Sequence, residues 1–273
     1  MAERLAPVAA LVRRHDRDRF QTALFAPAAA REALFALYAF NYEIARVRES
    51  VTEPTLGQIR LEWWREAVAA AFSGGPVRRH DVVEAVTAAI RTHNLSRTLF
   101  DRLIDAREAD LDADPPPTLA VLEDYAEATS SGLIQLALEV LGVRDAAAAE
   151  AARHIGIAYA LAGLLRALPL LAGRRPIIPA DIAQRAGLGA ADRSTPALCD
   201  AAAEIGAAAL SHVQSRPKSI PRAALPALLP AVIARHALRR LARAGWDPFD
   251  PRAARPDPLQ SWRLGTAMIR RRL

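Results

Sequence analysis

The feature that most constrains this chain is a succession of alanine- and leucine-rich segments separated by residues that start or stop helices. Pro54 sits at a first-turn position, Gly74 and Gly75 follow the segment that it opens, and Asp257-Pro258 combines a cap with a first-turn proline. Alanine and leucine are among the most favourable helix formers. Because no segment sustains a period-two alternation of apolar and polar residues, the sequence predicts an all-α protein with essentially no sheet.

The same start and stop signals place the helices along the chain. We expect helices at about 28–50, 54–72, 81–93, 96–112, 119–141, 145–168, 196–214, 221–243 and 258–272. The helix at 119–141 has a soft point near Ser130, Ser131 and Gly132, and Pro169 should kink or end the next one, because proline lacks the backbone donor. The short connections favour antiparallel packing of neighbouring helices. We therefore expect a single domain over residues 1–273.

The net charge excludes few classes of binding partner. Lysine and arginine number 36 and aspartate and glutamate number 30, which leaves a formal charge of +6. Most of the positive charge is arginine, and such a balance suits anionic lipid, diphosphate or nucleic acid. Since the chain has no recognised nucleic-acid motif, we expect no nucleic-acid partner.

The apolar runs are too short to cross a bilayer. The longest run without a charge covers residues 155–165, against the roughly 20 residues that a spanning helix needs. The run at 5–12 is broken by Pro7 and lacks a small-residue cleavage site. Cys199 is the only cysteine, so no intrachain disulfide can form. We expect a cytoplasmic protein, located at the inner face of the membrane if it contacts one.

Several short motifs occur in an order that resembles the squalene/phytoene synthase family. They span nearly the whole chain: Asp18–Pro27, Ala36–Phe40, Arg60–Arg65, Ile104–Leu111 and Ala244–Phe249. The resemblance implies an isoprenoid-synthase-like helical bundle with a central cavity, across which the helices at 28–50 and 145–168 face each other. In an active synthase each of these two helices carries aspartates that hold Mg²⁺, and the ions hold prenyl diphosphate.

The first of these aspartate-rich motifs is degenerate here. The matching positions are Ala45, Arg46 and Glu49, and their spacings of three and four place them on one helix face. Mg²⁺ prefers oxygen ligands, usually carboxylates together with substrate phosphates. Ala45 offers no ligand and Arg46 has the wrong charge, so Glu49 stands alone.

The second motif also lacks carboxylates. An arginine normally precedes it, and here Arg166 is followed by Ala167, Leu170 and Leu171 at the motif positions, with no acidic residue anywhere from 151 to 180. Prenyl transfer begins with ionisation of a carbon–diphosphate bond, and the leaving group needs a metal ion or an equivalent clamp. The sequence therefore predicts no catalytic residue, no metal site and no cofactor.

This degenerate pattern resembles one branch of the family, the assembly factors of respiratory complex I. The segments similar to that branch are Leu165–Pro169, Tyr125–Ser131 and Asn41–Ile44. The resemblance implies a non-enzymatic factor that contacts complex I subunits or assembly intermediates, holds a lipid or prenyl ligand and meets the membrane peripherally. The alternative is a head-to-head prenyl transferase of isoprenoid biosynthesis, which would use Mg²⁺ and farnesyl or geranylgeranyl diphosphate.

Five residues are candidates for holding an anionic ligand: Tyr38, Tyr42, Arg46, Arg166 and Arg174. Tyr38 and Tyr42 lie one helical turn apart, so they line a pocket together or belong to the core. Arg46 either replaces a metal ion or forms a surface ion pair with a neighbouring glutamate. Arg166 lies in an apolar stretch and needs a partner, while Arg174 belongs to a Gly/Pro-rich loop that favours exposure to solvent.

Two charged segments have simpler interpretations. Asp101, Asp105, Glu108 and Asp112 share one helix face, but arginines alternate with them. That pattern is typical of a salt-bridged, solvent-facing helix and argues against a displaced metal site. The basic helix at 263–272 either contacts anionic lipid or only complements the helix dipole.

Overall fold

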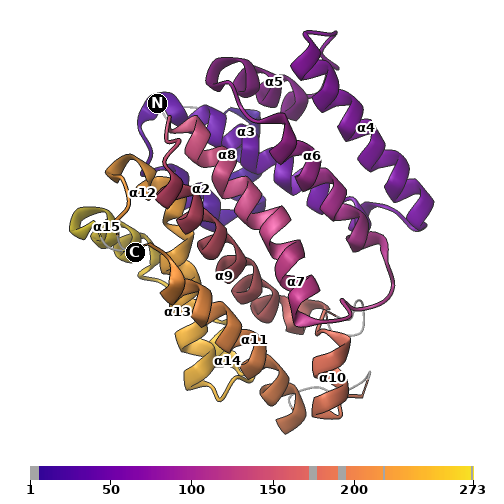
Figure 1. The fold of residues 1–273 in the computed structure, drawn as a ribbon, viewed down its shortest axis with the longest axis vertical. Helices are drawn as coiled ribbons and strands as arrows, with labels where there is room; N and C mark the ends of the chain where they lie inside the picture. The colour runs from indigo at the N-terminus through magenta and orange to yellow at the C-terminus, as the bar shows by residue number, and fades with distance from the viewer. Residues whose placement is uncertain (1–5, 172–176, 190–194, 218, 272) are drawn as a thin grey trace.

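The computed structural model describes residues 6–171, 177–189, 195–217, 219–271 and 273, and these residues form helices and no strand (Figure 1). The helices of the first half are α1 (Pro7–His15), α2 (Arg17–Ala23), α3 (Ala28–Ala45), α4 (Pro54–Ser73), α5 (Asp81–His93), α6 (Arg97–Ala106), α7 (Leu119–Ala126) and α8 (Gly132–Val140). Those of the second half are α9 (Ala146–Leu171), α10 (Ala180–Ala186), α11 (Pro196–Ser215), α12 (Leu225–Leu228), α13 (Pro230–Arg243), α14 (Pro251–Ala254) and α15 (Gln260–Arg270). The all-α prediction is confirmed.

Local caps fix several helix ends where the sequence predicts them. α4 has its proline in the first turn and ends at Gly74, whose φ of 74° lies in the left-handed region that glycine adopts readily. α5 ends at Asn94, which has a φ of 49°. The Thr118 hydroxyl accepts a hydrogen bond from the backbone N–H of Val121 and so caps α7.

Other helices differ in extent from their predicted ranges. α3 ends at Ala45, and a 3₁₀ turn, Arg48–Ser50, follows it. The helix expected at 119–141 is split by the π-helical turn Glu127–Ser131, which coincides with the predicted soft point. α9 passes through Pro169 and is described as far as Leu171. The N–H that proline lacks would bond to the carbonyl of Leu165, so α9 passes this point without that hydrogen bond.

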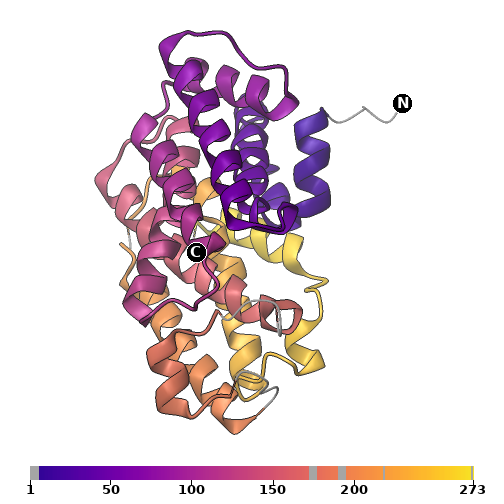
Figure 2. The same ribbon diagram turned by 90° about the vertical axis from the view of Figure 1, so that its right-hand side faces the viewer.

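α9 is the central helix of the bundle, and α8, α11, α13 and the π turn pack against it (Figures 1 and 2). Gly156 allows the closest approach, since a β-carbon at this position would collide with Ser131 of the π turn. The Ser131 hydroxyl donates to the Arg153 carbonyl of α9 at 2.6 Å. α9 is long and apolar enough to span a membrane by length and composition, but 44% of its apolar window is buried inside the molecule. A helix that is apolar all round is typical of a core or of a membrane span, and in this molecule α8, α11 and α13 pack around α9.

Buried side chains form two apolar clusters, one around each half of α9. In the first cluster, Phe40 of α3 meets the rings of Trp64 and Phe100 edge-on, with ring centres 5.5 and 5.3 Å apart. In the second cluster, the Trp246 ring lies in a notch of α11 at Gly206, where any β-carbon would collide with it. α9 and α13 of the second cluster also supply walls of a large pocket.

Candidate functional site

A pocket of about 840 Å³ lies between α2, α9, α13 and the segment that leads into α15. Small-molecule sites typically have volumes of roughly 300–1,000 Å³. The charged side chains that line the pocket are five arginines, two aspartates and a histidine: Arg17, Arg166, Arg240, Arg255, Arg263, Asp18, Asp257 and His236. Because arginine binds carboxylate and phosphate in a bidentate way, this lining suits an anionic ligand.

The second degenerate motif faces this pocket and the first does not. Arg166, Ala167 and Leu170 of α9 line it, whereas Leu171 lies outside the lining. No described residue of α3 reaches the pocket. The expectation that the helices at 28–50 and 145–168 face each other across one cavity therefore needs correction, and the reason is the position of α2.

α2 places a buried arginine between α3 and α9. The Arg19 guanidinium lies 5.0 Å from the ring centre of Tyr159 on α9 and pairs with Asp16 at 2.8 Å. Burial alone would lower the pKa of Arg19, but the Asp16 carboxylate reverses this, so the pKa is raised overall. Tyr38 of α3 is buried beside the same ion pair, and burial raises its pKa to about 12. A permanent cation and neutral tyrosines thus fill this space.

A second guanidinium, that of Arg107, is also enclosed in the interior. It donates to the Tyr125 hydroxyl at 2.6 Å, to the Asp110 carboxylate at 3.2 Å and to the Asn41 amide oxygen of α3 at 3.2 Å. The Tyr125 hydroxyl donates to the other oxygen of Asp110 at 2.8 Å. Burial lowers the pKa of Arg107, but Tyr125 and Asp110 raise it overall. The network joins three elements through a cation that stays charged.

Arg166 is the predicted ligand-binding residue that the structure places in the pocket. Its guanidinium pairs with Asp18 of α2 at 3.1 Å. Burial lowers the pKa of Arg166, while Asp18 raises it overall. The side chain is still 45% exposed, so part of the guanidinium remains accessible to a ligand. Arg174, the other candidate from this part of the chain, lies outside the described residues.

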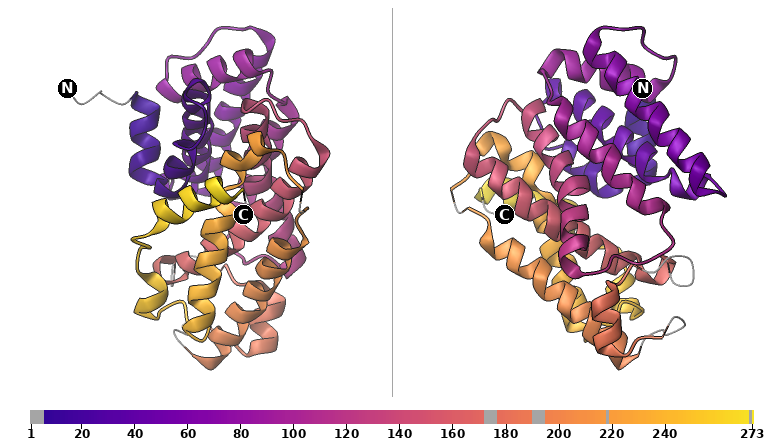
Figure 3. Two further views of the ribbon diagram at one scale, coloured as in Figure 1. Left: turned by 90° about the vertical axis from the view of Figure 1, so that its left-hand side faces the viewer. Right: turned by 45° about the vertical axis from the view of Figure 1, so that its right-hand side comes forward.

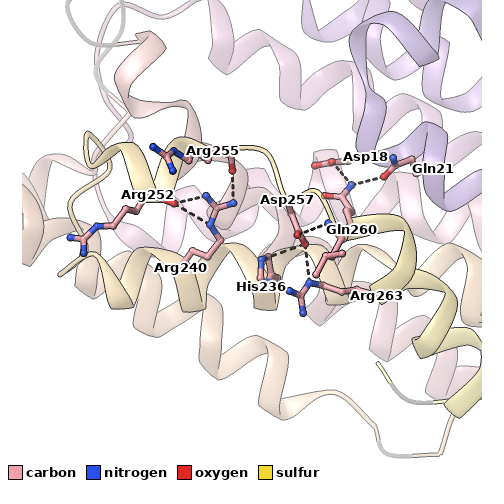
Figure 4. Close-up of polar contacts among 10 residues, drawn as sticks. Asp18, Gln21, His236, Arg240, Arg252, Arg255, Asp257, Gln260 and Arg263 are labelled. Carbon is pink, nitrogen blue, oxygen red and sulfur yellow. Dashed lines mark hydrogen bonds and ion pairs between the residues drawn. The ribbon is translucent and has the colours of Figure 1, made fainter.

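α13 and the residues before α15 form the opposite wall (Figure 4). Asp257 accepts a hydrogen bond from Arg263 at 3.0 Å and lies 3.4 Å from the His236 ring nitrogen. Burial is the main reason that the pKa of His236 is lowered, and the nearby arginines add to the effect although Asp257 opposes it. His236 is therefore predominantly neutral at pH 7.

Two further side chains hold this wall in place. The Gln260 amide donates to Asp18 at 2.8 Å, which links α15 to α2 across one end of the pocket. Arg240 of α13 donates hydrogen bonds to the backbone carbonyls of Arg252, within α14, and of Arg255, directly after it, and so attaches α14 to α13 (Figure 4). The pocket is thus held at both ends by side chains from separate helices.

The residues of the first degenerate motif lie on another part of the molecule. Tyr42 stacks on His15 of α1, with ring centres 4.4 Å apart. Arg46 caps α3, lies over the Tyr42 ring and pairs with Glu43 at 3.4 Å. Glu49 is exposed in the 3₁₀ turn. Arg46 therefore forms a local ion pair and does not line the pocket.

The residues at the two motifs do not fit a Mg²⁺ site. Glu49 is the only carboxylate among the six motif positions, and Ala45, Ala167, Leu170 and Leu171 have no ligand atom in their side chains. Elsewhere in the described part of the chain, no group of three or more His, Cys, Asp or Glu side chains is arranged to hold a metal ion.

The acidic helix face at 101–112 is engaged in ion pairs. Arg65 of α4 pairs with Asp105 at 2.9 Å and also with Glu108. Arg97 pairs with Asp101 at 3.4 Å. These side chains are largely exposed, as expected for the salt-bridged face that the sequence indicates.

The two interior arginines and several pocket residues were not predicted from the sequence. Arg19 and Arg107 lie in segments rich in both charges, a composition that normally predicts solvent exposure. Each of these arginines has an acidic residue three positions away, and it pairs with that residue in the structure: Arg19 with Asp16 and Arg107 with Asp110. This spacing was an available signal in the sequence. His236 and Asp257 come from separate segments, and no local spacing connects them.

The chain is similar to known proteins over most of its length. Residues 12–263 match the family described as squalene/phytoene synthase. The chain is 34% identical over 268 residues to the complex I assembly factor 6 of Bos taurus, covering 93% of this chain and 80% of that protein. It is 29% identical over 205 residues to a presqualene diphosphate synthase of Rhodopseudomonas palustris, covering 72% and 71%. A squalene synthase structure from Alicyclobacillus acidocaldarius matches with a TM-score of 0.77 and 22% identity, over 89% of this chain and 94% of that one, which confirms the isoprenoid-synthase fold.

Proposed function

This chain belongs to the squalene/phytoene synthase family, and we propose that it is a non-enzymatic member that assists the assembly of respiratory complex I. Its similarity over nearly its whole length to a protein named as a complex I assembly factor supports this role. The partners would be complex I subunits or assembly intermediates. We place the protein in the cytoplasm, at the inner face of the membrane in which that complex is built.

The observation that carries the proposal is the chemistry of the two motif positions. Expulsion of diphosphate leaves negative charge on the departing oxygens, and a cluster of carboxylates and metal ions must stabilise that charge. In this chain Arg166 faces the pocket, but the motif positions after it are Ala167 and Leu170. Such a pocket can bind an anion without supplying the metal that helps it leave.

We infer that the ligand is a lipid or prenyl compound with an anionic head group. Five arginines and two aspartates line the pocket, which gives an excess of positive charge at the site. Arg166 and Arg263 are each oriented by an aspartate, so little ordering remains to be done when a phosphate binds. No resident cofactor is needed for this role.

A deletion strain of the source organism tests the assignment. We expect membranes from the strain to lose NADH–ubiquinone oxidoreductase activity and fully assembled complex I on native gels, while carotenoid and hopanoid levels hold. Complementation with the wild-type chain should restore both readouts. Normal complex I together with depleted isoprenoids would reverse the assignment.

A second candidate, Mg²⁺-dependent head-to-head prenyl transfer, is favoured by the similarity to a presqualene diphosphate synthase. It requires Mg²⁺ to be held by some side chains other than those at the degenerate motifs. The same deletion strain distinguishes the two functions. If the protein is a transferase, the strain should have lower isoprenoid levels and normal complex I activity.

A further inference from the structure

α15 presents large apolar side chains on the outside of the molecule. Trp262 is 64% exposed, Ile269 is 83% exposed, and Leu259, immediately before the helix, is 53% exposed. Spacings of three and seven residues put these side chains on one face of the helix. Leu264 and Ala267, on the opposite face, are buried against the bundle. α15 is therefore apolar on two faces, and packing within the molecule explains only one of them.

The same helix is strongly cationic. Arg263, Arg270 and Arg271 lie on or directly after it, and the sequence contains no acidic residue after Asp257. Arg263 is paired with Asp257, whereas Arg270 and Arg271 form no ion pair within the described residues. An exposed apolar stripe bordered by unpaired arginines complements a surface that is negatively charged outside and apolar beneath.

The pocket lies next to this helix. Gln260, Ser261 and Arg263 of α15 line it, and Leu170, which lines it from the end of α9, is 75% exposed. α15 crosses the outer surface between the N-terminal helices and α13 (Figure 3, left). A β-carbon added at Gly265 would lie 3.8 Å from the Phe25 ring, so α15 passes close to the residues after α2, where Leu24 is 45% exposed. Exposed apolar groups thus extend from the helix to neighbouring segments.

We propose that this face, with Trp262 and Ile269 at its centre, docks onto the surface of an anionic lipid bilayer. The helix lies in the plane of the interface, with the indole of Trp262 at the level of the head groups, which tryptophan favours. Arg270 and Arg271 contact lipid phosphates, and the adjacent pocket then opens close to the lipid from which a ligand can enter.

A bilayer fits this face better than a protein partner or a second copy does. The eleven residues of α15 extend about 16 Å, and the stripe has three large apolar side chains. A standard protein–protein interface takes roughly 20–30 residues from each side. A bilayer needs no such complementary surface, because apolar area and cationic charge together determine the binding.

This inference names the membrane-facing surface of the location proposed above, but its test does not involve complex I. Purified protein is sedimented with vesicles of phosphatidylglycerol and phosphatidylcholine, and with vesicles of phosphatidylcholine alone. We expect binding to the anionic vesicles that weakens with added salt, and at least tenfold weaker binding for Trp262→Ser/Ile269→Ser. Ile59→Ser on α4 is the matched control, since Ile59 is 61% exposed and lies on another helix.

Equal vesicle binding by the wild type and the double variant would overturn the proposal, and so would an equal loss in Ile59→Ser. Both altered side chains are exposed, so the melting temperature should hold and show that the variants fold. The purified protein could bind vesicles through α15 although a strain without its gene still assembles complex I. That pair of results would refute only the proposed function.

Fluorescence provides a second readout of the same contact. Trp262 is the one exposed residue among the four tryptophans. We expect a blue shift of the emission when anionic vesicles are added, and loss of that shift in Trp262→Phe, which keeps an aromatic ring and should still sediment with the vesicles. A shift that persists in Trp262→Phe would place a different face on the lipid and contradict the assignment.

Discussion

At the residue scale, the pocket is defined by guanidinium groups whose positions are fixed by other polar groups. Arg166 is held by Asp18, Arg263 by Asp257, and Arg240 by backbone carbonyls. A charge-assisted hydrogen bond is stronger than a neutral one and restricts the side chain to one geometry. The guanidinium groups are therefore held in fixed positions, as our proposal of an anionic ligand requires.

Replacement of Arg166 by alanine should weaken binding of an anionic ligand. With farnesyl thiodiphosphate as the probe, we expect the dissociation constant to rise about tenfold, since a lost charge-assisted hydrogen bond corresponds to about 1.4 kcal/mol or more. Isothermal titration calorimetry would measure it. Arg46→Ala is the matched control, because Arg46 pairs with Glu43 away from the pocket. Equal effects of the two substitutions would refute the placement of the ligand beside Arg166.

His236 should make the stability of the fold depend on pH. Burial lowers its pKa in the folded state, so below about pH 6.5 the unfolded chain binds more protons than the folded chain. The free energy of unfolding should therefore fall as the pH drops from about 6.5 toward the lowered pKa. Urea titrations of the wild type and His236→Gln at pH 7.5 and 5.5 check this. His236→Gln should lose less stability between these two values, and an identical loss would contradict the prediction.

At the element scale, single glycines determine how closely the helices approach. Gly206 of α11 receives the Trp246 ring, and Gly156 of α9 receives Ser131. The π turn that carries Ser131 and the left-handed Trp246, with a φ of 61°, are unusual backbone conformations at these two contacts. The packing of α9 and α11 thus explains why small residues stand at these two points.

Gly206→Ala should destabilise the fold by about 1–3 kcal/mol, because its β-carbon would force the Trp246 ring out of its notch. Gly163→Ala on α9 is the control: no atom lies within 4 Å of the added carbon, so alanine should stabilise that helix by about 0.5–1 kcal/mol. Thermal unfolding followed by circular dichroism measures both. A lower melting temperature for Gly163→Ala, or an unchanged melting temperature for Gly206→Ala, would refute this view of the packing.

Helix positions were predictable from the sequence where a local signal exists. Pro54, Gly74 and Asn94 fix the ends of α4 and α5 through backbone conformations that depend on those residues alone. The end of α3 and the course of α9 past Pro169 were not predictable in this way. Both helices pack against several neighbours, and tertiary contacts of this kind can override local preference.

At the scale of the whole molecule, the chain has a synthase-like scaffold in which the second motif region lines the pocket and the first lies outside it. The all-α bundle and the family were predictable, because many weak motifs occur in one order along the chain. The pocket was only partly predictable: Arg166 was identified, but Asp18, His236 and Asp257 meet it from distant segments. Only the tertiary arrangement brings them together, with Arg19 of α2 lying over the Tyr159 ring of α9.

We propose that the pocket binds an anionic ligand without ionising it. The most direct measurement is incubation of the purified protein with radiolabelled farnesyl diphosphate and Mg²⁺, followed by extraction and chromatography of the products. We expect the protein to retain labelled ligand and to form no condensed product above the protein-free control. Formation of presqualene diphosphate or squalene at an ordinary enzymatic rate, on the order of 1 s⁻¹ or faster, would contradict it.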